Sequence, residues 1–182
     1  LWLPERLGHE YGSEVIFGFK HYILVKTGMT PPPLYKELSL LLPTSGSTGS
    51  SKLVRHSYKN VEANARNVSL LFGLDKHERA LAALPIYYTM GLSVISSHIY
   101  AGATILLTGK SLTDGKFWTF MKEHRATSFT GVPYSFEVLQ KLRFFRMELP
   151  HLQLITQGGG KMDEKLFRTC ADYAEKNGKK FI

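Results

Sequence analysis

From Leu38 onward, short apolar runs alternate with longer segments whose apolar residues recur at helical spacing. The apolar runs are rich in Leu, Ile, Val and Thr and are too short for typical helices, so they favour strands. The longer segments place apolar residues three and four positions apart, which is typical of a helix with one buried face. This alternation predicts βαβ units, and therefore a layered α/β fold with a mostly parallel sheet and helices on both faces.

The boundaries of these elements follow from the runs and from Gly and Pro. We expect strands at 38–42, 80–84, 103–108, 126–130 and 152–156, and a further strand beginning at Phe181 and Ile182. We expect helices at 57–71, 91–100, 116–124, 134–142 and 163–176. Ser57 is the expected N-cap of the first helix, because its hydroxyl can accept a hydrogen bond from a free backbone N–H.

The segment before Leu38 has a different character. Residues 17–26, FGFKHYILVK, predict one strand, and residues 27–34 form a Pro-rich connection. We therefore divide the chain into a lead-in strand with its connection, residues 1–37, and an α/β lobe, residues 38–182.

Composition narrows the classes of protein. The 182 residues are 43% hydrophobic and carry a formal charge of +8, which is compatible with a globular domain. The basic residues are scattered, so solvated helix faces explain them better than a nucleic-acid surface does. Cys170 is the single cysteine, so no internal disulfide can form and a reducing, cytoplasmic location is expected. No apolar run reaches the ~18 residues that a membrane-spanning helix needs.

Residues 44–52, TSGSTGSSK, form a Gly/Ser/Thr tract that allows two interpretations. One is a flexible linker, because Gly- and Ser-rich segments are flexible chains. The other is a phosphate-binding loop, because Gly-rich turns at the carboxyl ends of strands let backbone N–H groups converge on an anion. A strand precedes the tract, a helix is expected soon after it, and Lys52 adds a positive charge. This context favours the loop.

The tract does not fit the two most familiar phosphate loops. The P-loop needs Gly directly before Lys, and the dinucleotide fingerprint needs a second Gly two residues after the first. The pattern that remains, T-S-G-S-T-G-x-x-K, resembles the signature of the adenylate-forming enzymes: acyl-CoA synthetases, luciferase-like ligases and peptide-synthetase adenylation domains. The chain departs from the usual signature at Ser51 and Leu53, where the family has Pro and Gly.

Further landmarks of that family follow in its order. Ser57 to Asn60 resembles T-H-x-N, with Tyr58 in the place of His. Pro85 to Gly91 resembles P-x-[FY]-H-x-x-G, with Tyr88 in the place of His. The stretches YAGATILLT, Gly131-Val132-Pro133 and LITQGGGKM resemble a helix-to-strand step, a V-P before a helix and the Gly turn that lies against adenine in the family.

The resemblance implies an activity and a set of residues. Such enzymes join a carboxylic acid to AMP from ATP with release of pyrophosphate, and then pass the acyl group to a thiol of CoA or of a carrier protein's phosphopantetheine. It implies that the nucleotide is held by Thr44, Ser45, Gly46, Ser47, Thr48, Gly49 and Lys52, with Thr48 and Lys52 acting in catalysis, and by Gly158, Gly159 and Gly160. It also implies that Tyr87, Tyr88 and Gly91 bind the acid.

Plainer interpretations of some of these residues stay open. Tyr87 and Tyr88 could be core aromatics, and residues 158–160 could be an ordinary strand–helix turn. Lys161 is a further candidate near the nucleotide or simply an exposed turn lysine. The histidines match no metal-ligand spacing, and we expect no metal ligand within the chain.

Several parts of the family's machinery are not among the 182 residues. We expect the Mg²⁺-binding Glu beyond residue 182, together with the ribose-binding Asp and a mobile C-terminal domain with its Lys. We therefore expect an N-terminal part of a longer ligase that is inactive alone and self-associates through an open sheet edge. Two alternatives stay open: a non-catalytic nucleotide- or anion-binding module, and a nucleic-acid-binding domain.

Overall fold

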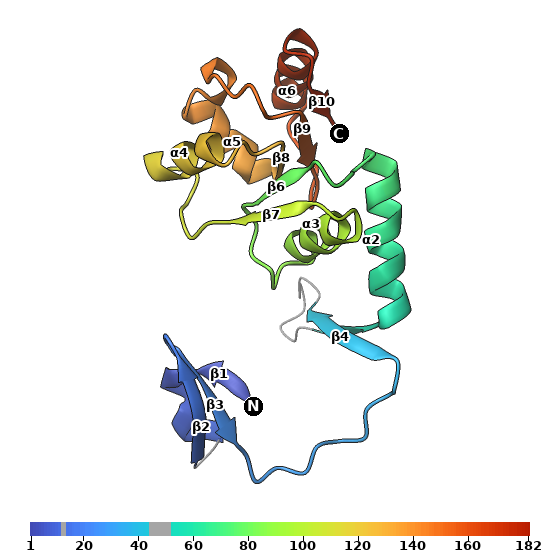
Figure 1. Ribbon diagram of the computed structural model, residues 1–182, viewed down its shortest axis with the longest axis vertical. Coiled ribbons are helices and arrows are strands. Elements are labelled where there is room, and N and C mark those ends of the chain that lie inside the picture. The colour runs from blue at the N-terminus through green and yellow to red at the C-terminus, as the bar shows by residue number, and fades with distance from the viewer. Residues whose placement is uncertain (12–13, 44–51) are drawn as a thin grey trace. The chain divides into compact units, whose positions relative to one another are not determined.

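The computed structural model describes residues 1–11, 14–43 and 52–182 (Figure 1). These residues divide into two compact units, Leu1–Lys36 and Glu37–Ile182. The parallel sheet and the helices that cover it belong to the second unit.

The first unit is a small antiparallel sheet with strand order β1-β3-β2. Its elements are β1 (Trp2–Pro4), η1 (Glu5–Leu7), α1 (Gly8–Tyr11), β2 (Glu14–Phe19) and β3 (Tyr22–Lys26). The prediction of one strand over residues 17–26 is wrong, because the chain reverses at Lys20, which has a φ of 54°. A Lys-His pair lacks the Gly or Asn that usually signals such a turn, so the hairpin is not evident from the sequence.

The second unit is built on a five-stranded parallel sheet with strand order β10-β9-β8-β6-β7. Its strands are β6 (Arg79–Ala82), β7 (Thr104–Leu107), β8 (Ser128–Gly131), β9 (Leu154–Gln157) and β10 (Lys180–Phe181). The predicted fold class is therefore confirmed. Within the described residues β10 is an edge strand; self-association through that edge stays a prediction.

All of the predicted helices form, with boundaries within a few residues of those expected. They are α2 (Tyr58–Phe72), α3 (Thr89–Tyr100), α4 (Gly115–Glu123), α5 (Pro133–Lys141) and α6 (Glu164–Lys176), with a short η2 (Phe144–Arg146) after α5. The predicted N-cap of α2 is confirmed: the Ser57 hydroxyl accepts from the Asn60 backbone N–H, and the Asn60 side chain accepts from the Ser57 N–H.

The predicted strand at 38–42 exists as β4 (Leu38–Pro43), but it does not join the parallel sheet. It pairs antiparallel with β5 (Leu53–Ser57), a strand that the sequence analysis missed. Arg55 and His56 interrupt the apolar pattern of that segment, which hid it. A short strand therefore stands between the Gly/Ser/Thr tract and α2, and the helix begins within one residue of the predicted position.

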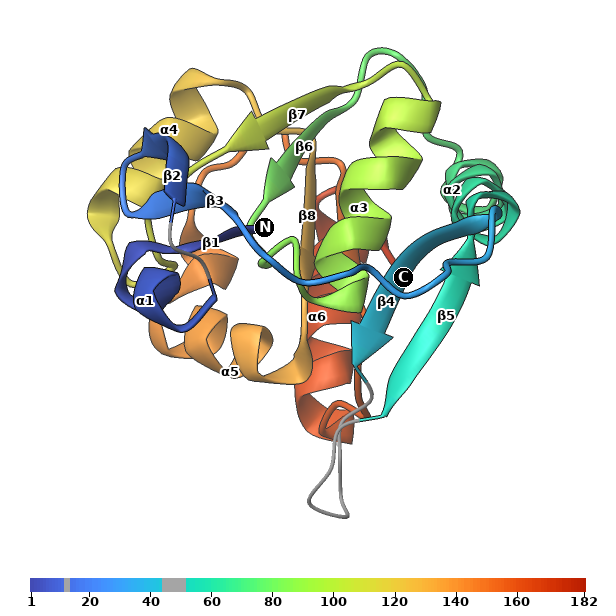
Figure 2. The ribbon, with the colours of Figure 1, turned by 90° about the horizontal axis from the view of Figure 1, so that it is seen from below.

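Helices cover both faces of the parallel sheet. Figure 2 shows α4 and α5 on one side of β6, β7 and β8, and α3 with α2 on the other. On the α4 and α5 side, apolar side chains from the sheet, from these two helices and from α6 form one buried cluster. That cluster includes Leu81, Leu106, Phe129 and Ile155 from the strands and Phe117, Phe136 and Leu166 from the helices. Alternation along each strand turns the neighbouring residues to the opposite face, toward α3.

Candidate functional site

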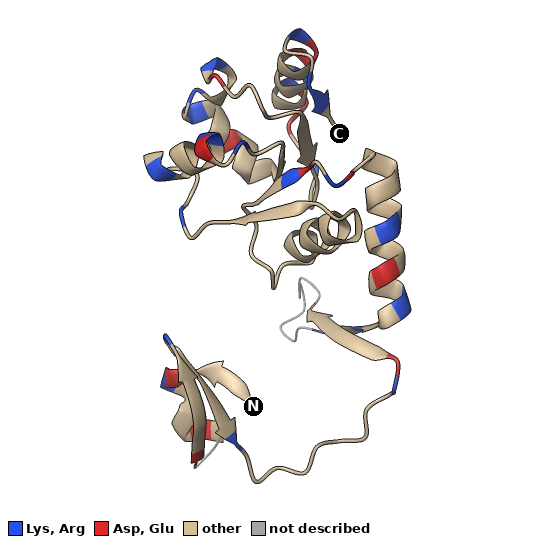
Figure 3. Ribbon diagram, in the orientation of Figure 1, with Lys and Arg blue, Asp and Glu red and all other residues tan. Residues whose placement is uncertain are grey.

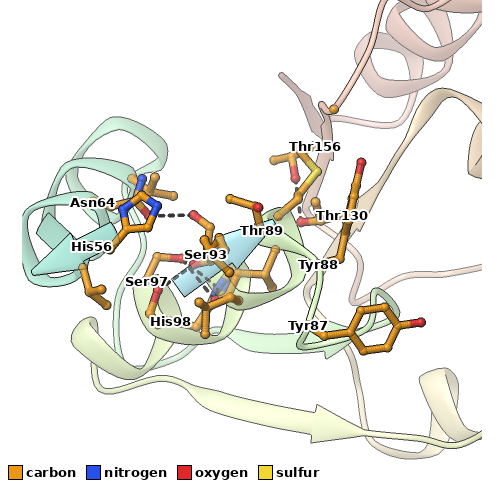
Figure 4. Close-up of a pocket in the computed structure, with 18 of the residues that line it drawn as sticks. His56, Asn64, Tyr87, Tyr88, Thr89, Ser93, Ser97, His98, Thr130 and Thr156 are labelled. Carbon is orange, nitrogen blue, oxygen red and sulfur yellow. Dashed lines mark hydrogen bonds between the residues drawn. The ribbon is translucent and has the colours of Figure 1, made fainter. Parts of the chain in front are cut away.

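A cavity of about 780 Å³ lies within the second unit, on the α3 face of the sheet (Figure 4). It is bounded by the β4–β5 hairpin, by α2 and α3, and by the carboxyl-terminal halves of β8 and β9. In parallel α/β sheets the carboxyl ends of the strands are where ligands bind, because the connecting loops and helix starts converge there. The volume is in the range of sites that enclose a small organic molecule.

The sheet contributes hydroxyl groups to this cavity. Thr130 of β8 and Thr156 of β9 are both buried, and their Oγ1 atoms lie 2.7 Å apart in a hydrogen bond (Figure 4). These residues sit opposite each other in the parallel register. One of the two hydroxyls donates to the other, so at most one hydroxyl proton of the pair is left for a ligand.

A buried histidine lies under the same face. His98 Nδ1 is 2.7 Å from the Val94 carbonyl oxygen, and its Nε2 is 3.2 Å from Ser128 Oγ. Because a carbonyl only accepts, Nδ1 carries the proton and Nε2 accepts from the Ser128 hydroxyl. Burial lowers the pKa of His98, although the Val94 hydrogen bond and the charge of Glu78 act in the opposite direction. His98 is thus a neutral imidazole at neutral pH.

The two helices of this face are joined by a polar contact. Ser93 Oγ of α3 donates to Asn64 Oδ1 of α2 over 2.9 Å (Figure 4). Ser96 and Ser97 use their hydroxyls within α3, donating to the Ser93 and Val94 carbonyls. These three serine hydroxyls of α3 are therefore engaged in bonds within the cavity wall.

Tyr87 and Tyr88 both line the cavity, but they differ in orientation. Tyr88 lies beside Thr130, whereas Tyr87 points away from the other labelled side chains (Figure 4). With exposures of 79% and 41%, Tyr87 and Tyr88 are not core aromatics. Binding of an acid by these two side chains stays a prediction.

Gly91 is buried at the start of α3 and lies outside the cavity lining. A Cβ on Gly91 would lie 2.2 Å from the Pro85 carbonyl oxygen. Close packing of α3 on the preceding backbone therefore explains this glycine, and its contact with an acid stays a prediction.

The Gly158–Gly160 turn follows β9, and Gly159 is the member that lines the cavity. Gly159 has a φ of +80°, and a Cβ there would lie 3.1 Å from the Tyr88 hydroxyl. A Cβ on Gly158 would lie 2.1 Å from Met90 Cε. The left-handed backbone of the turn thus favours glycine at 159, whereas at 158 the flexible end of Met90 could move aside. The exposed backbone of Gly159 can approach a flat ligand closely.

Most of the Gly/Ser/Thr tract lies outside the described residues, including Thr44, Ser45, Gly46, Ser47, Thr48 and Gly49. Lys52 is described; its side chain is exposed and it directly precedes β5. The first residue of β5, Leu53, pairs with Pro43, and Pro43 lines the cavity. The described residues that flank the tract therefore belong to the β4–β5 hairpin, while the roles of the tract's own residues stay predictions.

The sequence analysis missed several residues of the cavity wall: His56, Asn64, Ser93, His98, Thr130 and Thr156. A signal for some of them exists. Ser128 and Thr130 are polar residues at alternate positions of β8, and Thr156 follows two apolar residues in β9; buried polar groups of this kind need a reason. Likewise Ser96, Ser97 and His98 interrupt a helix that reads as buried.

In the described part of the chain, no group of three or more His, Cys, Asp or Glu side chains is arranged to hold a metal ion. None of the described helices is long and apolar enough to cross a membrane. Lys and Arg occur on α2, α4, α6 and several loops, and Asp and Glu occur on the same helices (Figure 3). The expectation that these charges form solvated helix faces stays a prediction.

Comparison with protein families and curated proteins gives consistent results. The family profile described as "AMP-binding enzyme" matches residues 9–179. A 2-succinylbenzoate–CoA ligase of Staphylococcus aureus (strain MSSA476) is 30% identical over 137 residues, which cover 75% of this chain and 27% of the ligase. The chain thus spans about a quarter of the length of the curated relatives it matches.

Solved structures show the same fold. O-succinylbenzoate CoA synthetase (MenE) from Bacillus subtilis, in complex with AMP, matches with a TM-score of 0.62 and 26% identity, over 73% of this chain and 27% of that one. The N-terminal domain of FACL13 from Mycobacterium tuberculosis matches with a TM-score of 0.66 and 22% identity, over 77% of this chain and 36% of that one.

Proposed function

Since this chain belongs to the AMP-binding enzyme family, we propose that the protein activates a carboxylic acid with ATP and then transfers it to a thiol. In the first step a carboxylate oxygen attacks the α-phosphorus, and the bond to pyrophosphate breaks, which leaves an acyl-adenylate. In the second step a thiolate attacks the acyl carbon and AMP leaves. CoA is the proposed thiol, because the curated relatives are named CoA ligases; a carrier protein is the alternative acceptor.

One observation carries this proposal. The cavity is bordered on one side by the strand ends that flank the Gly/Ser/Thr tract, and on another by Gly159 and Tyr88. Pro43, directly before the tract, and Tyr88 and Gly159, from the segments predicted to hold acid and adenine, are far apart in the sequence, yet they line one cavity of suitable size. A chance resemblance of separate motifs would not require this convergence.

The described residues include groups suited to bind ATP but no carboxylate suited to bind its magnesium ion at the cavity. The Gly159 backbone is exposed and could lie against adenine, and Lys52 could approach the phosphates from the exposed start of β5. No carboxylate is among the described lining residues, so they do not form a magnesium site. We assign no step to the metal. What this chain would supply is positioning, the positive charge of Lys52 and a largely apolar wall for the acid.

The proposal is tested by replacing Lys52 in the full-length protein. Lys52→Ala should slow acid-dependent ATP–pyrophosphate exchange by roughly ten- to 150-fold, the equivalent of ~1.5–3 kcal/mol for one charge-assisted contact. Thiol transfer from a pre-made acyl-adenylate should change much less, because pyrophosphate has already left. Lys59→Ala removes the same charge from an exposed position on α2 and is the control.

Other outcomes of this experiment argue against the proposal. Equal loss in both half-reactions would mean that Lys52 supports the fold. Loss in neither would return the Gly/Ser/Thr tract to the linker interpretation. ATP binding without any acid-dependent exchange, over a broad panel of acids, would favour a non-catalytic nucleotide-binding module.

A further inference from the structure

Among the described residues, the cavity wall combines apolar side chains with hydroxyl, amide and imidazole groups. None of the described residues that line it is Lys, Arg, Asp or Glu. We propose that the acid activated here carries a single charge, the carboxylate that reacts, and that its body is neutral. This inference rests on the proposed function and narrows its substrate class.

The serine hydroxyls of the wall cannot serve a second anion without breaking an existing bond. Ser93 donates to Asn64, and Ser96 and Ser97 donate to backbone carbonyls of α3. A hydroxyl has one proton, so each of these groups is left with acceptor capacity only. An anion needs donors, and these three side chains have none to offer.

The polar side chains on the sheet side of the cavity, which we call its floor, also bond to one another or to backbone. Thr130 and Thr156 bond to each other, so the pair has one hydroxyl proton left. The His98 ring donates from Nδ1 to the Val94 carbonyl and accepts at Nε2 from Ser128, which uses both nitrogens. The floor therefore accommodates a neutral ligand without rearrangement.

The apolar part of the wall describes the ligand body. Leu42, Val68, Phe72, Val94 and Leu154 contribute aliphatic and aromatic surface to the cavity. Apolar surface of this kind favours an alkyl or aryl group, because its burial removes hydrocarbon from water. A second carboxylate placed against the same surface would lose its hydration without gaining a cation, which is strongly unfavourable.

The acid proposed for this chain differs in charge from the acid for which its relatives are named. Those relatives are named for 2-succinylbenzoate, an acid with two carboxylates. At 30% identity the residues that surround an acid can differ while the fold is retained. The neutral wall predicts that 2-succinylbenzoate is a poor substrate of this protein.

The test compares acids that differ by one carboxylate. 4-Oxo-4-phenylbutanoate is 2-succinylbenzoate without the ring carboxylate, and octanoate and octanedioate form a second, aliphatic pair. The comparison uses the full-length protein and whichever of the two pairs contains the more active acid. Within that pair, kcat/KM for acid-dependent ATP–pyrophosphate exchange should be at least about tenfold higher for the monoacid than for the diacid. A diacid used equally well or better would overturn the inference and leave the proposed function intact.

Binding provides a readout that does not depend on turnover. Calorimetry with the same four acids should show the same preference for the monoacids. If no acid supports exchange but the monoacids bind more tightly, the proposed function fails and the inference about the wall holds. If no acid supports exchange and no acid binds, both fail.

A variant tests whether the missing charge is the cause. Asn64 lines the cavity from an exposed position on α2, so Asn64→Lys adds a cation there, and Asn64→Met adds similar length without charge. Asn64→Lys should reduce the ratio of kcat/KM for the monoacid to kcat/KM for the diacid several-fold, and Asn64→Met should leave this ratio unchanged. Melting temperatures check that both variants fold. An unchanged ratio in Asn64→Lys, or an equal change in Asn64→Met, would overturn the inference.

Discussion

The two faces of the parallel sheet are built from the same strands but have different contents. On the α4 and α5 face, Phe129 of β8 joins a closed apolar cluster and packs edge-to-face on Phe136. On the α3 face, Ser128 and Thr130 of the same strand hydrogen-bond to His98 and Thr156, and Thr130 borders a cavity. Neighbouring residues of one strand therefore serve two purposes.

The physical origin of this division is the two-residue period of a strand. Each residue points to the face opposite its neighbours, so a strand can be apolar on one face and polar on the other. A closed apolar face supplies most of the folding free energy, since burial of hydrocarbon is its main source. The other face can then hold polar groups and empty space. The comparison predicts that substitutions on the first face change stability and that those on the second change binding.

The largest expected effect is on the apolar face. Phe129→Ala should lower the free energy of unfolding by about 3–5 kcal/mol, because it removes a fully buried ring and leaves a cavity. Urea unfolding measures this change. Thr130→Val, one position along the strand, removes a hydroxyl at similar volume and should cost only about 0.5–1.5 kcal/mol. Similar losses in the two variants would contradict the division between the faces.

A smaller effect is expected where the α3 face is closely packed. Gly91→Ala should cost about 1–3 kcal/mol, because the added Cβ meets the Pro85 and Leu84 carbonyl oxygens and α3 must shift. Gly115→Ala is the control, since a Cβ there meets nothing within 4 Å, and its stability should be unchanged or slightly higher. Thermal melting of both variants distinguishes them. A neutral Gly91→Ala would show that the helix start adjusts freely.

The smallest effect concerns the pH dependence of stability through His98. Its pKa in the folded protein is below the ordinary 6.5, so the unfolded chain takes up the proton more readily. The contribution of neutral His98 to the free energy of unfolding is therefore fully present above pH 6.5. It is lost as the pH falls from 6.5 to the lower pKa that His98 has in the folded protein. The slope from one such group is at most about 1.4 kcal/mol per pH unit.

The variant His98→Asn isolates that contribution. Its amide can still donate to the Val94 carbonyl, but it does not titrate. Urea unfolding between about pH 7.5 and about pH 5 should give a shallower decline for His98→Asn than for the natural protein. Identical declines in the two proteins would show that His98 takes up a proton in the folded state without cost.

The elements of the α/β lobe could be predicted from periodicity, and the hairpins could not. Helices α2 to α6 and the parallel strands follow local patterns of apolar residues that their buried faces require. The β2–β3 reversal at Lys20 and strand β5 depend on pairing partners elsewhere in the chain, and their own residues give a weak signal. The Gly turn and the two tyrosines were identified through a family resemblance, whereas His98, Thr130 and Thr156 were not identified at all.

The sequence by itself determined the family, the class of fold, the positions of helices α2 to α6 and the Ser57 cap, because these depend on local composition, spacing and motif order. Only the tertiary structure decided which of the polar residues meet. His98, Thr130 and Asn64 come from three elements, and their approach depends on strand order and on how α2 and α3 pack over the sheet. Such contacts follow from the packing of segments that are distant in the sequence, so a local pattern of residues does not predict them.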